Sequence, residues 1–251
     1  MAGVATSATP DVEFFHLTDG AADRDDGTLA LGWWPHDGSI LFALADGLGG
    51  VAGGVASRLA LDALDGALGE APAAWPMKTR LRRALQQANL AVYQKRITIP
   101  ELHAMATAVT ATSVLGGTLV TVHVGDCRLF LLRDGRLSQL SKDHESVQAG
   151  TSAPFERSLE RAVGRELIVP IDTIRLQLAA GDVLCQCTAA VHRALGDAEL
   201  GELLTAHLPP AACRALLRRA RAEGAEGSLG VQVAAVATDP STPAPTRRSW
   251  W

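Results

Sequence analysis

One segment of the sequence strongly constrains the fold, the run LFALADGLGGVAGGVASRLALDAL at residues 41–64. An apolar stretch suited to a buried strand ends at Asp46, a glycine-rich turn follows, and helical spacing then begins. The Asp46 carboxylate and the Gly47 carbonyl are both oxygen ligands of the kind that hard divalent cations prefer. The same pattern is also typical of an ordinary turn between a strand and a helix, so alone it leaves both interpretations open.

The remainder of the chain is predicted to contain many short strands and a few helices. Alternating or apolar runs predict strands at residues 13–17, 28–34, 40–45, 109–115, 118–124, 128–133, 136–140, 182–187 and 231–237. Helical spacing predicts helices at residues 53–68, 77–96, 198–206 and 210–223. Gly-Gly and Asp-Gly pairs between strands indicate tight hairpins, and no βαβ alternation runs through the chain. The fold class is therefore α+β rather than a doubly wound sheet.

Composition indicates one domain with a tail at each end. The chain has 251 residues, of which 47% are hydrophobic, enough to build a sizeable core. Residues 1–11 are small and polar, and residues 238–251 are rich in Pro, Ser and Thr, which cannot build a core. We therefore expect a disordered N-terminal tail, one domain at 12–237 and a flexible C-terminal tail.

Charge and hydropathy exclude some classes of partner. A net charge of −4 and an isoelectric point near 6.0 give no electrostatic case for binding nucleic acid. No apolar run is long enough to span a bilayer, and the N-terminus lacks the features of a signal peptide, so we expect a cytoplasmic protein without membrane contact. The four cysteines, at positions 127, 185, 187 and 213, lack zinc-type spacing and are expected to be reduced core residues.

A second informative segment lies at residues 107–145. It places a Gly125-Asp126 corner and Arg128 between two hairpins, and ends on Asp143-His144. The Gly-Asp corner with its arginine is a weak signal when it occurs alone, and so is the Asp-His pair. Their order along the chain, after Asp46, is more specific than any one of them.

Together these motifs resemble the PP2C family of metal-dependent Ser/Thr protein phosphatases. ADGLGG is similar to that family's DGMGG turn, and VGDCRLFLLRDGRLSQLSKDH to its GDSR and DH stretch. LERAVG at 159–164 resembles the TRALG element, and LAAGDVLCQCT at 178–188 resembles the L-x-x-GD strand. The resemblance implies an α-β-β-α sandwich, two antiparallel sheets flanked by helices.

The resemblance also implies a binuclear Mg²⁺ or Mn²⁺ site that hydrolyses phosphoserine or phosphothreonine. It makes Asp46 the bridging carboxylate and Gly47 a carbonyl ligand. Asp25 and Asp26 correspond to the family's acidic pair, and Asp126 to a residue near an outer metal. In this interpretation Asp46 and Asp26 are catalytic, and Asp46, Gly47, Asp126 and Asp25 are the metal-binding positions.

At three positions the chain departs from the family pattern. Ala189 and Gly227 stand where the family has metal-binding aspartates, and Ala21 stands where it has a phosphate-binding arginine. Arg24 and Arg58 are candidates to replace that arginine. Because two divalent ions need several carboxylates, we expect the binuclear site to be incomplete.

Three acids are candidates to compensate for the missing aspartates. They are Asp182, Asp197 and Glu226, of which Glu226 is the most plausible because it directly precedes Gly227.

Two functions follow from this comparison. The first is a pseudophosphatase, a regulatory protein-binding module in bacterial-type phosphosignalling whose partner is a phosphoprotein, a protein kinase or another regulatory protein. The alternative is an active or weakly active Mg²⁺- or Mn²⁺-dependent Ser/Thr phosphatase with a reduced metal site. A third hypothesis is that the chain is an α+β domain whose role the sequence does not assign.

Overall fold

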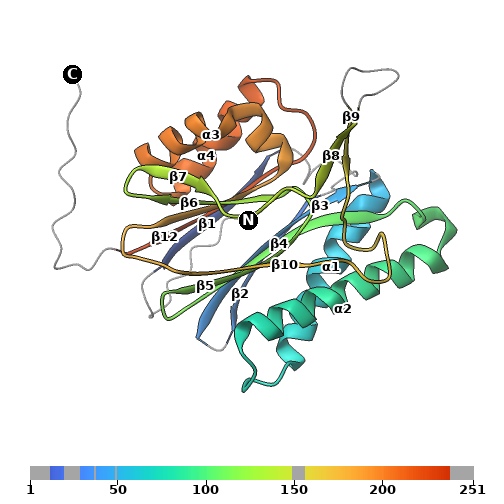
Figure 1. The fold of residues 1–251 in the computed structure, drawn as a ribbon. Helices are drawn as coiled ribbons and strands as arrows, with labels where there is room; N and C mark the ends of the chain where they lie inside the picture. Colours follow the sequence, from blue (N-terminus) through green and yellow to red (C-terminus); the bar gives the residue numbers. More distant parts are fainter. Residues whose placement is uncertain (1–11, 20–28, 37, 49, 149–155, 238–251) are drawn as a thin grey trace, which may run out of the picture.

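The computed structural model describes residues 12–19, 29–36, 38–48, 50–148 and 156–237. These residues form four layers, with two five-stranded antiparallel sheets between two layers of helices (Figure 1). The α-β-β-α sandwich implied by the family resemblance is thereby confirmed. The predicted tails, 1–11 and 238–251, lie outside the described residues.

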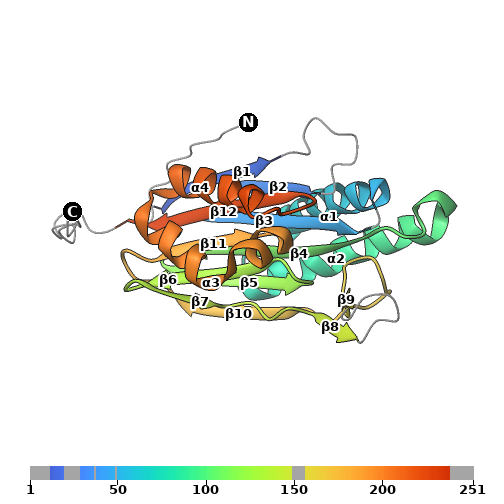
Figure 2. The ribbon, with the colours of Figure 1, turned by 90° about the horizontal axis from the view of Figure 1, so that it is seen from above.

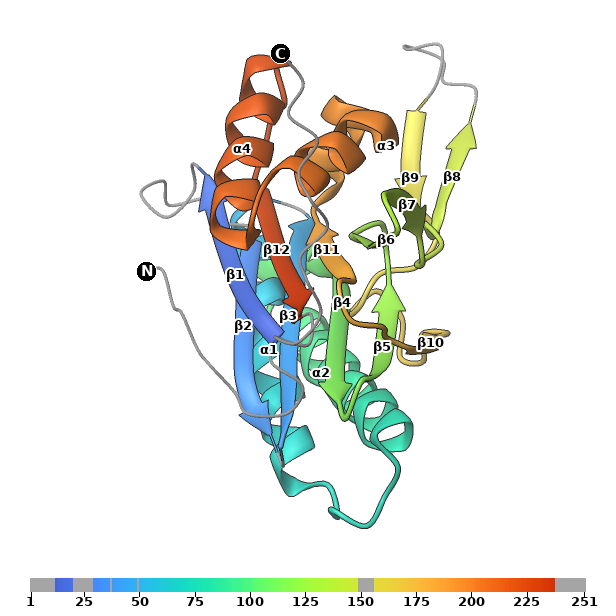
Figure 3. The same cartoon turned by 90° about the vertical axis from the view of Figure 1, so that its left-hand side faces the viewer.

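Each sheet combines segments that are distant in the sequence. The first sheet has the order β1 (Val12–Asp19), β12 (Leu229–Val236), β11 (Val183–Cys187), β6 (Arg128–Arg133) and β7 (Arg136–Gln139). The second has the order β10 (Asp172–Gln177), β5 (Thr118–Val124), β4 (Ala106–Leu115), β3 (Ser39–Leu48) and β2 (Leu29–His36). A separate hairpin of β8 (Glu145–Gln148) and β9 (Glu156–Leu159) projects from one side of the sandwich (Figures 1 and 3).

Two helices cover the outer face of each sheet. The helices α1 (Val51–Glu70) and α2 (Met77–Thr98) pack on the second sheet, and α3 (Ala189–Ala206) and α4 (Pro209–Ala222) pack on the first (Figure 2). A short 3₁₀ turn, η1 (Pro100–Leu102), follows α2. No helix among the described residues is long and apolar enough to cross a membrane.

The core follows these layers. One apolar cluster lies between α1, α2 and the second sheet, and includes Leu64 and Leu85. Another lies between α3, α4 and the first sheet, and a third, including Phe42 and Leu184, lies between the two sheets. Burying each such side chain contributes about 1.5–3 kcal/mol. This burial holds the strand ends that carry the candidate site.

A polar chain crosses the space between the two sheets. The Gln186 side chain accepts a hydrogen bond from Thr112 at 2.5 Å and donates one to Gln232 at 2.9 Å. Gln232 in turn donates to the Gly32 carbonyl at 3.1 Å. Because all three side chains are fully buried, these bonds fix how the sheets align as well as satisfying the polar groups.

The structure departs from the sequence prediction in two regions. The element α3 consists of two helical segments joined across a kink at Gly196, where φ is 70° and ψ is 168°. The segment after the kink corresponds to the helix predicted at 198–206, and the segment that begins at Ala189 was not predicted. The strands β8, β9 and β10 were not predicted. They are short strands with little apolar alternation, and β10 is positioned by its pairing with β5.

Candidate functional site

Asp46 lies near the end of β3, where packing against α1 fixes its backbone. Its neighbours Leu41, Ala43 and Ala45 belong to the helix-facing core, so the alternation of the strand turns Asp46 toward the other sheet. The Thr107 hydroxyl donates to the Asp46 carbonyl at 3.0 Å. A methyl group added at Gly47 would lie 2.1 Å from the Gly53 carbonyl oxygen, so only glycine allows α1 to approach this closely.

A cavity of about 540 Å³ opens beside Asp46. Most of the sequence-predicted site residues described by the structure meet at its wall. The cavity is lined by Asp46, Gly47, Asp126, Ala189, Glu226 and Gly227, together with Leu48, Ala190, Arg193, Ala194, Glu223, Gly224, Ala225 and Ser228. The topology thus joins the ends of β3 and β5, the start of α3 and the segment before β12.

The other predicted positions do not contribute to this wall. Asp25, Asp26, Ala21 and Arg24 lie outside the described residues. Arg58 is exposed on α1 and is not among the described residues that line the cavity.

Two of the three candidate compensating acids are engaged elsewhere. Asp182 accepts from the Arg133 guanidinium at 2.6 Å and from the Ala179 amide at 2.8 Å. Asp197 lies 3.5 Å from Arg128. Glu226 is therefore the one of the three that lines the cavity.

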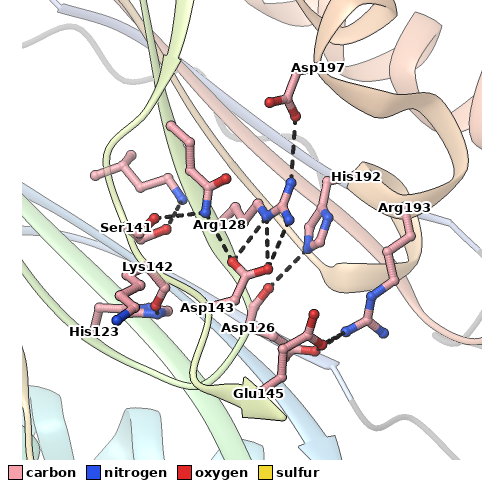
Figure 4. A network of polar contacts seen from close by, with 12 residues as sticks. His123, Asp126, Arg128, Ser141, Lys142, Asp143, Glu145, His192, Arg193 and Asp197 are labelled. Atoms are coloured by element: carbon pink, nitrogen blue, oxygen red, sulfur yellow. Dashed lines mark hydrogen bonds and ion pairs between the residues drawn. The ribbon is translucent and has the colours of Figure 1, made fainter. Parts of the chain in front are cut away.

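Arg193 is a cavity residue that the sequence analysis missed. Its guanidinium lies 2.8 Å from the Asp126 carboxylate and 2.5 Å from that of Glu145, and it points toward both in Figure 4. The available signal was the spacing of four residues from Ala189, which puts the two side chains on one helix face. The sequence prediction starts this helix at residue 198, so it does not place Arg193 on one helix with Ala189.

The pKa values of Asp46 and Asp126 at the cavity are both raised. Burial, and then the charge of Asp126, raise the pKa of Asp46 to about 7, while Arg193 acts in the opposite direction. Burial also raises the pKa of Asp126, and its pairing with Arg193 limits that rise. The cavity therefore favours a bound positive charge, and within the described structure Arg193 supplies one.

The remaining motif residues support the corner that carries Asp126. The Arg128 guanidinium donates to both carboxylate oxygens of Asp143, at distances of 2.8–3.1 Å (Figure 4). The Gly125 amide donates to the His144 ring at 3.1 Å, and the other ring nitrogen lies 3.1 Å from Asp172. These contacts hold the loop that carries His144 against the Gly125-Asp126 corner.

Among the described residues, no group of three or more His, Cys, Asp and Glu side chains is arranged to hold a metal ion. The carboxylates that line the cavity come from Asp46, Asp126, Glu223 and Glu226. Two of them are already paired with arginines, Asp126 with Arg193 and Glu223 with Arg219.

Comparison with known proteins identifies the family. The family profile described as protein phosphatase 2C matches residues 7–165. The Ser/Thr protein phosphatase PstP of Mycobacterium tuberculosis is 36% identical over 179 residues, which make up 66% of this chain and 34% of PstP. The Ser/Thr phosphatase Stp of Listeria monocytogenes is 30% identical over 183 residues, 67% of this chain and 73% of Stp. This chain thus spans about a third of the length of PstP.

Solved structures agree with the sequence comparison. A crystal structure of PstP has a TM-score of 0.77 at 26% identity, covering 90% of this chain and 99% of that one. The catalytic domain of PstP in complex with two manganese ions gives a TM-score of 0.75 at 26% identity over the same shares. MsPP from Mycobacterium smegmatis, a phosphatase in complex with cacodylate, gives 0.74 at 28% identity over 92% of this chain and all of its own. With its sandwich of two sheets and its motifs in order, this chain belongs to the protein phosphatase 2C family.

Proposed function

We propose that this chain is a pseudophosphatase, a protein-binding module with a PP2C fold and a degenerate metal site. The observation that carries the proposal is the wall of the cavity beside Asp46. Ala189 and Gly227 line it at the positions where the family resemblance expects metal-binding aspartates. Neither residue offers a side-chain oxygen to a cation.

The donor set fits two divalent ions poorly. Two such ions held close together repel each other and need several carboxylates to offset the loss of their hydration shells. Of the cavity acids, Asp126 accepts from Arg193 at 2.8 Å, so an ion bound there must displace or repel a guanidinium. Asp25 and Asp26, outside the described residues, could add at most two carboxylates.

The partner class follows from the relatives. PstP and Stp are named as Ser/Thr phosphatases, and such enzymes recognise phosphorylated protein segments. A domain that keeps their fold but lacks turnover would bind a phosphoprotein, a protein kinase or another regulatory protein of the same signalling system. Its role would be to hold or shield that partner.

The alternative function is a weak Mg²⁺- or Mn²⁺-dependent Ser/Thr phosphatase. The observation in its favour is Glu226, which lines the same cavity as Asp46. In this reading Asp46, the Gly47 carbonyl, Asp126, Asp25 and Glu226 would hold the metal, and Asp46 and Asp26 would be catalytic. A bound metal would supply Lewis-acid activation of water and neutralise charge on the phosphoryl group.

Turnover measurements separate the two functions. The purified chain is assayed with Mn²⁺ or Mg²⁺ on p-nitrophenyl phosphate and on a phosphothreonine peptide, beside its Asp46→Ala variant. The proposal expects wild type and variant to be equally inactive, and metal-dependent turnover that Asp46→Ala abolishes would overturn it. A Mn²⁺ titration followed by calorimetry tests the alternative, which requires binding in the micromolar to millimolar range.

A further inference from the structure

A second cavity, of about 340 Å³, lies between the start of α2 and the second sheet. Its wall includes Met77, Lys78, Ser113, Leu115, Val120 and Arg175. Ser113 pairs with Leu41 in the sheet, whereas Asp46 pairs with Ala108, so five residues of β4 separate the two places. At about 3.4 Å per residue, the second cavity is roughly 17 Å along the strand from the Asp46 site.

A buried hydroxyl without a partner marks this cavity. Ser113 is 1% exposed, and its Oγ finds no hydrogen-bond partner among the described residues. It shares the helix-facing side of β4 with Val109 and Ala111, which directs it toward the cavity below α2. Since buried hydroxyls are normally hydrogen-bonded, this one is available to a polar group in the cavity.

The first turn of α2 offers further unused donors. This 22-residue helix has no side-chain cap and no acidic residue in its first turn. Within the described structure, the backbone amides of Met77 and Lys78 have no acceptor, whereas those of Thr79 and Arg80 bond to the Pro76 carbonyl. Free amides at a helix N-terminus, reinforced by the helix dipole, favour an anion.

The charged side chains at this cavity are all cations. Lys78 and Arg175 line it, and no acidic residue is among its described lining residues. Neither cation forms an ion pair with another described residue. The rest of the wall, with Met77, Leu115 and Val120, is apolar.

We propose that this cavity binds a small organic anion, with its phosphate or carboxylate between Lys78, Arg175 and the α2 amides and its apolar body against Leu115 and Val120. The Ser113 hydroxyl donates to the ligand. A volume of about 340 Å³ suits a compact metabolite rather than a peptide. The site is separate from the Asp46 cavity and needs no metal.

The test follows backbone amide signals by NMR on the full chain in EDTA, so that the Asp46 cavity holds no metal. Phenyl phosphate and benzoate are titrated separately, with benzyl alcohol as the neutral control. We expect the Met77 and Lys78 amides to shift with one or both anions and not with benzyl alcohol. The anion that binds more tightly identifies the head group.

Variants test whether the NMR shifts arise from binding in the second cavity. The double variant Lys78→Gln and Arg175→Gln should weaken binding at least tenfold, and Ser113→Ala should weaken it less. Arg82→Gln removes one charge from the exposed face of the same helix and should leave binding unchanged. Absence of shifts with both anions at 10 mM, equal affinity in the double variant, or shifts confined to the Asp46 cavity would each overturn the proposal.

Discussion

The guanidinium of Arg193 lies 2.8 Å from the Asp126 carboxylate, on the wall of the cavity that Asp46 shares. It also pairs with Glu145, so one arginine neutralises acids from two other segments. A divalent cation would need the same carboxylate oxygens. Arg193 thus competes with metal for Asp126 and balances the charge of the cavity without one.

Replacing Arg193 with glutamine should therefore raise the affinity of the protein for Mn²⁺. Removal of the guanidinium frees the Asp126 oxygen and makes the cavity more negative. We expect the dissociation constant measured by calorimetry to fall at least about tenfold, or about 1.4 kcal/mol. Because the Arg193 side chain is 39% exposed, loss of its ion pairs should cost the metal-free protein only about 1 kcal/mol.

Arg218→Gln is the matched control, because it removes the same charge from an exposed position on α4. It should change neither metal affinity nor stability. Equal Mn²⁺ affinity in Arg193→Gln and wild type would show that the guanidinium does not compete with metal.

Restoring a carboxylate at Ala189 should also strengthen metal binding. Ala189 is the first residue of α3, where a negative charge interacts favourably with the helix dipole and with Arg193 one turn later. Ala189 is also buried beside Asp46 and Asp126, so we expect Ala189→Asp to lower the stability of the metal-free protein and to bind Mn²⁺ several-fold more tightly. Ala189→Asn, with the same shape but no charge, should not bind Mn²⁺ more tightly, and an equal gain from asparagine would contradict the argument.

Restoring an aspartate at Gly227 should cost stability through the conformation of the backbone. Its φ of 83° is a backbone conformation that aspartate adopts at a cost, although a side chain there would meet no described atom within 4 Å. Gly227→Asp should thus lower the free energy of unfolding by about 1 kcal/mol. If Ala189→Asp together with Gly227→Asp yields metal-dependent turnover, loss of these two ligands explains the proposed inactivity.

Much of the site could be predicted from sequence because its residues sit in local motifs. Asp46 follows an apolar strand, and the alignment of motifs placed Ala189, Glu226 and Gly227, which the fold brings to one cavity. Arg193 escaped prediction because it lies in the helical segment before the kink at Gly196, whereas a helix was predicted only at 198–206. Its partner Glu145 begins a short strand that depends on pairing with β9 rather than on local pattern.

The pH dependence of stability should report a buried histidine. Burial, and then the charge of His144, lower the pKa of His123 to about 4 from an ordinary 6.5. In the unfolded chain His123 takes up a proton below pH 6.5, but in the folded protein it stays neutral until about pH 4. Its contribution to stability is therefore complete above pH 6.5 and is lost as the pH falls toward 4, by up to about 1.4 kcal/mol per pH unit.

Urea unfolding at pH 7, 5.5 and 4.5 measures this effect. The pKa of His192 is also lowered to about 4, so the difference between wild type and His123→Gln isolates one residue. The variant should lose less stability than wild type on acidification, although it is less stable at pH 7. His207→Gln, at an exposed position, should follow the wild-type curve, and parallel curves for His123→Gln and wild type would refute the assignment.

Two glycines of α1 should respond oppositely to alanine substitution. A methyl group at Gly53 would lie 2.7 Å from backbone atoms of Gly47 and Leu48, which cannot move without shifting the end of β3. Gly53→Ala should therefore lower the free energy of unfolding by about 2–3 kcal/mol. A methyl group at Gly66 meets nothing within 4 Å, so Gly66→Ala should raise it by about 0.5–1 kcal/mol through helix propensity.

The variants Gly53→Ala and Gly66→Ala also test whether the geometry of the Asp46 cavity depends on the close approach of α1 to the end of β3. Because Gly47 follows Asp46 directly, a displaced strand end would move the carboxylate away from Asp126 and Arg193. Amide NMR signals of residues 46, 126 and 193 should shift in Gly53→Ala and stay in place in Gly66→Ala. Unchanged signals in a destabilised Gly53→Ala protein would mean that the strand end moves independently of the cavity, and that the glycine contact serves stability alone.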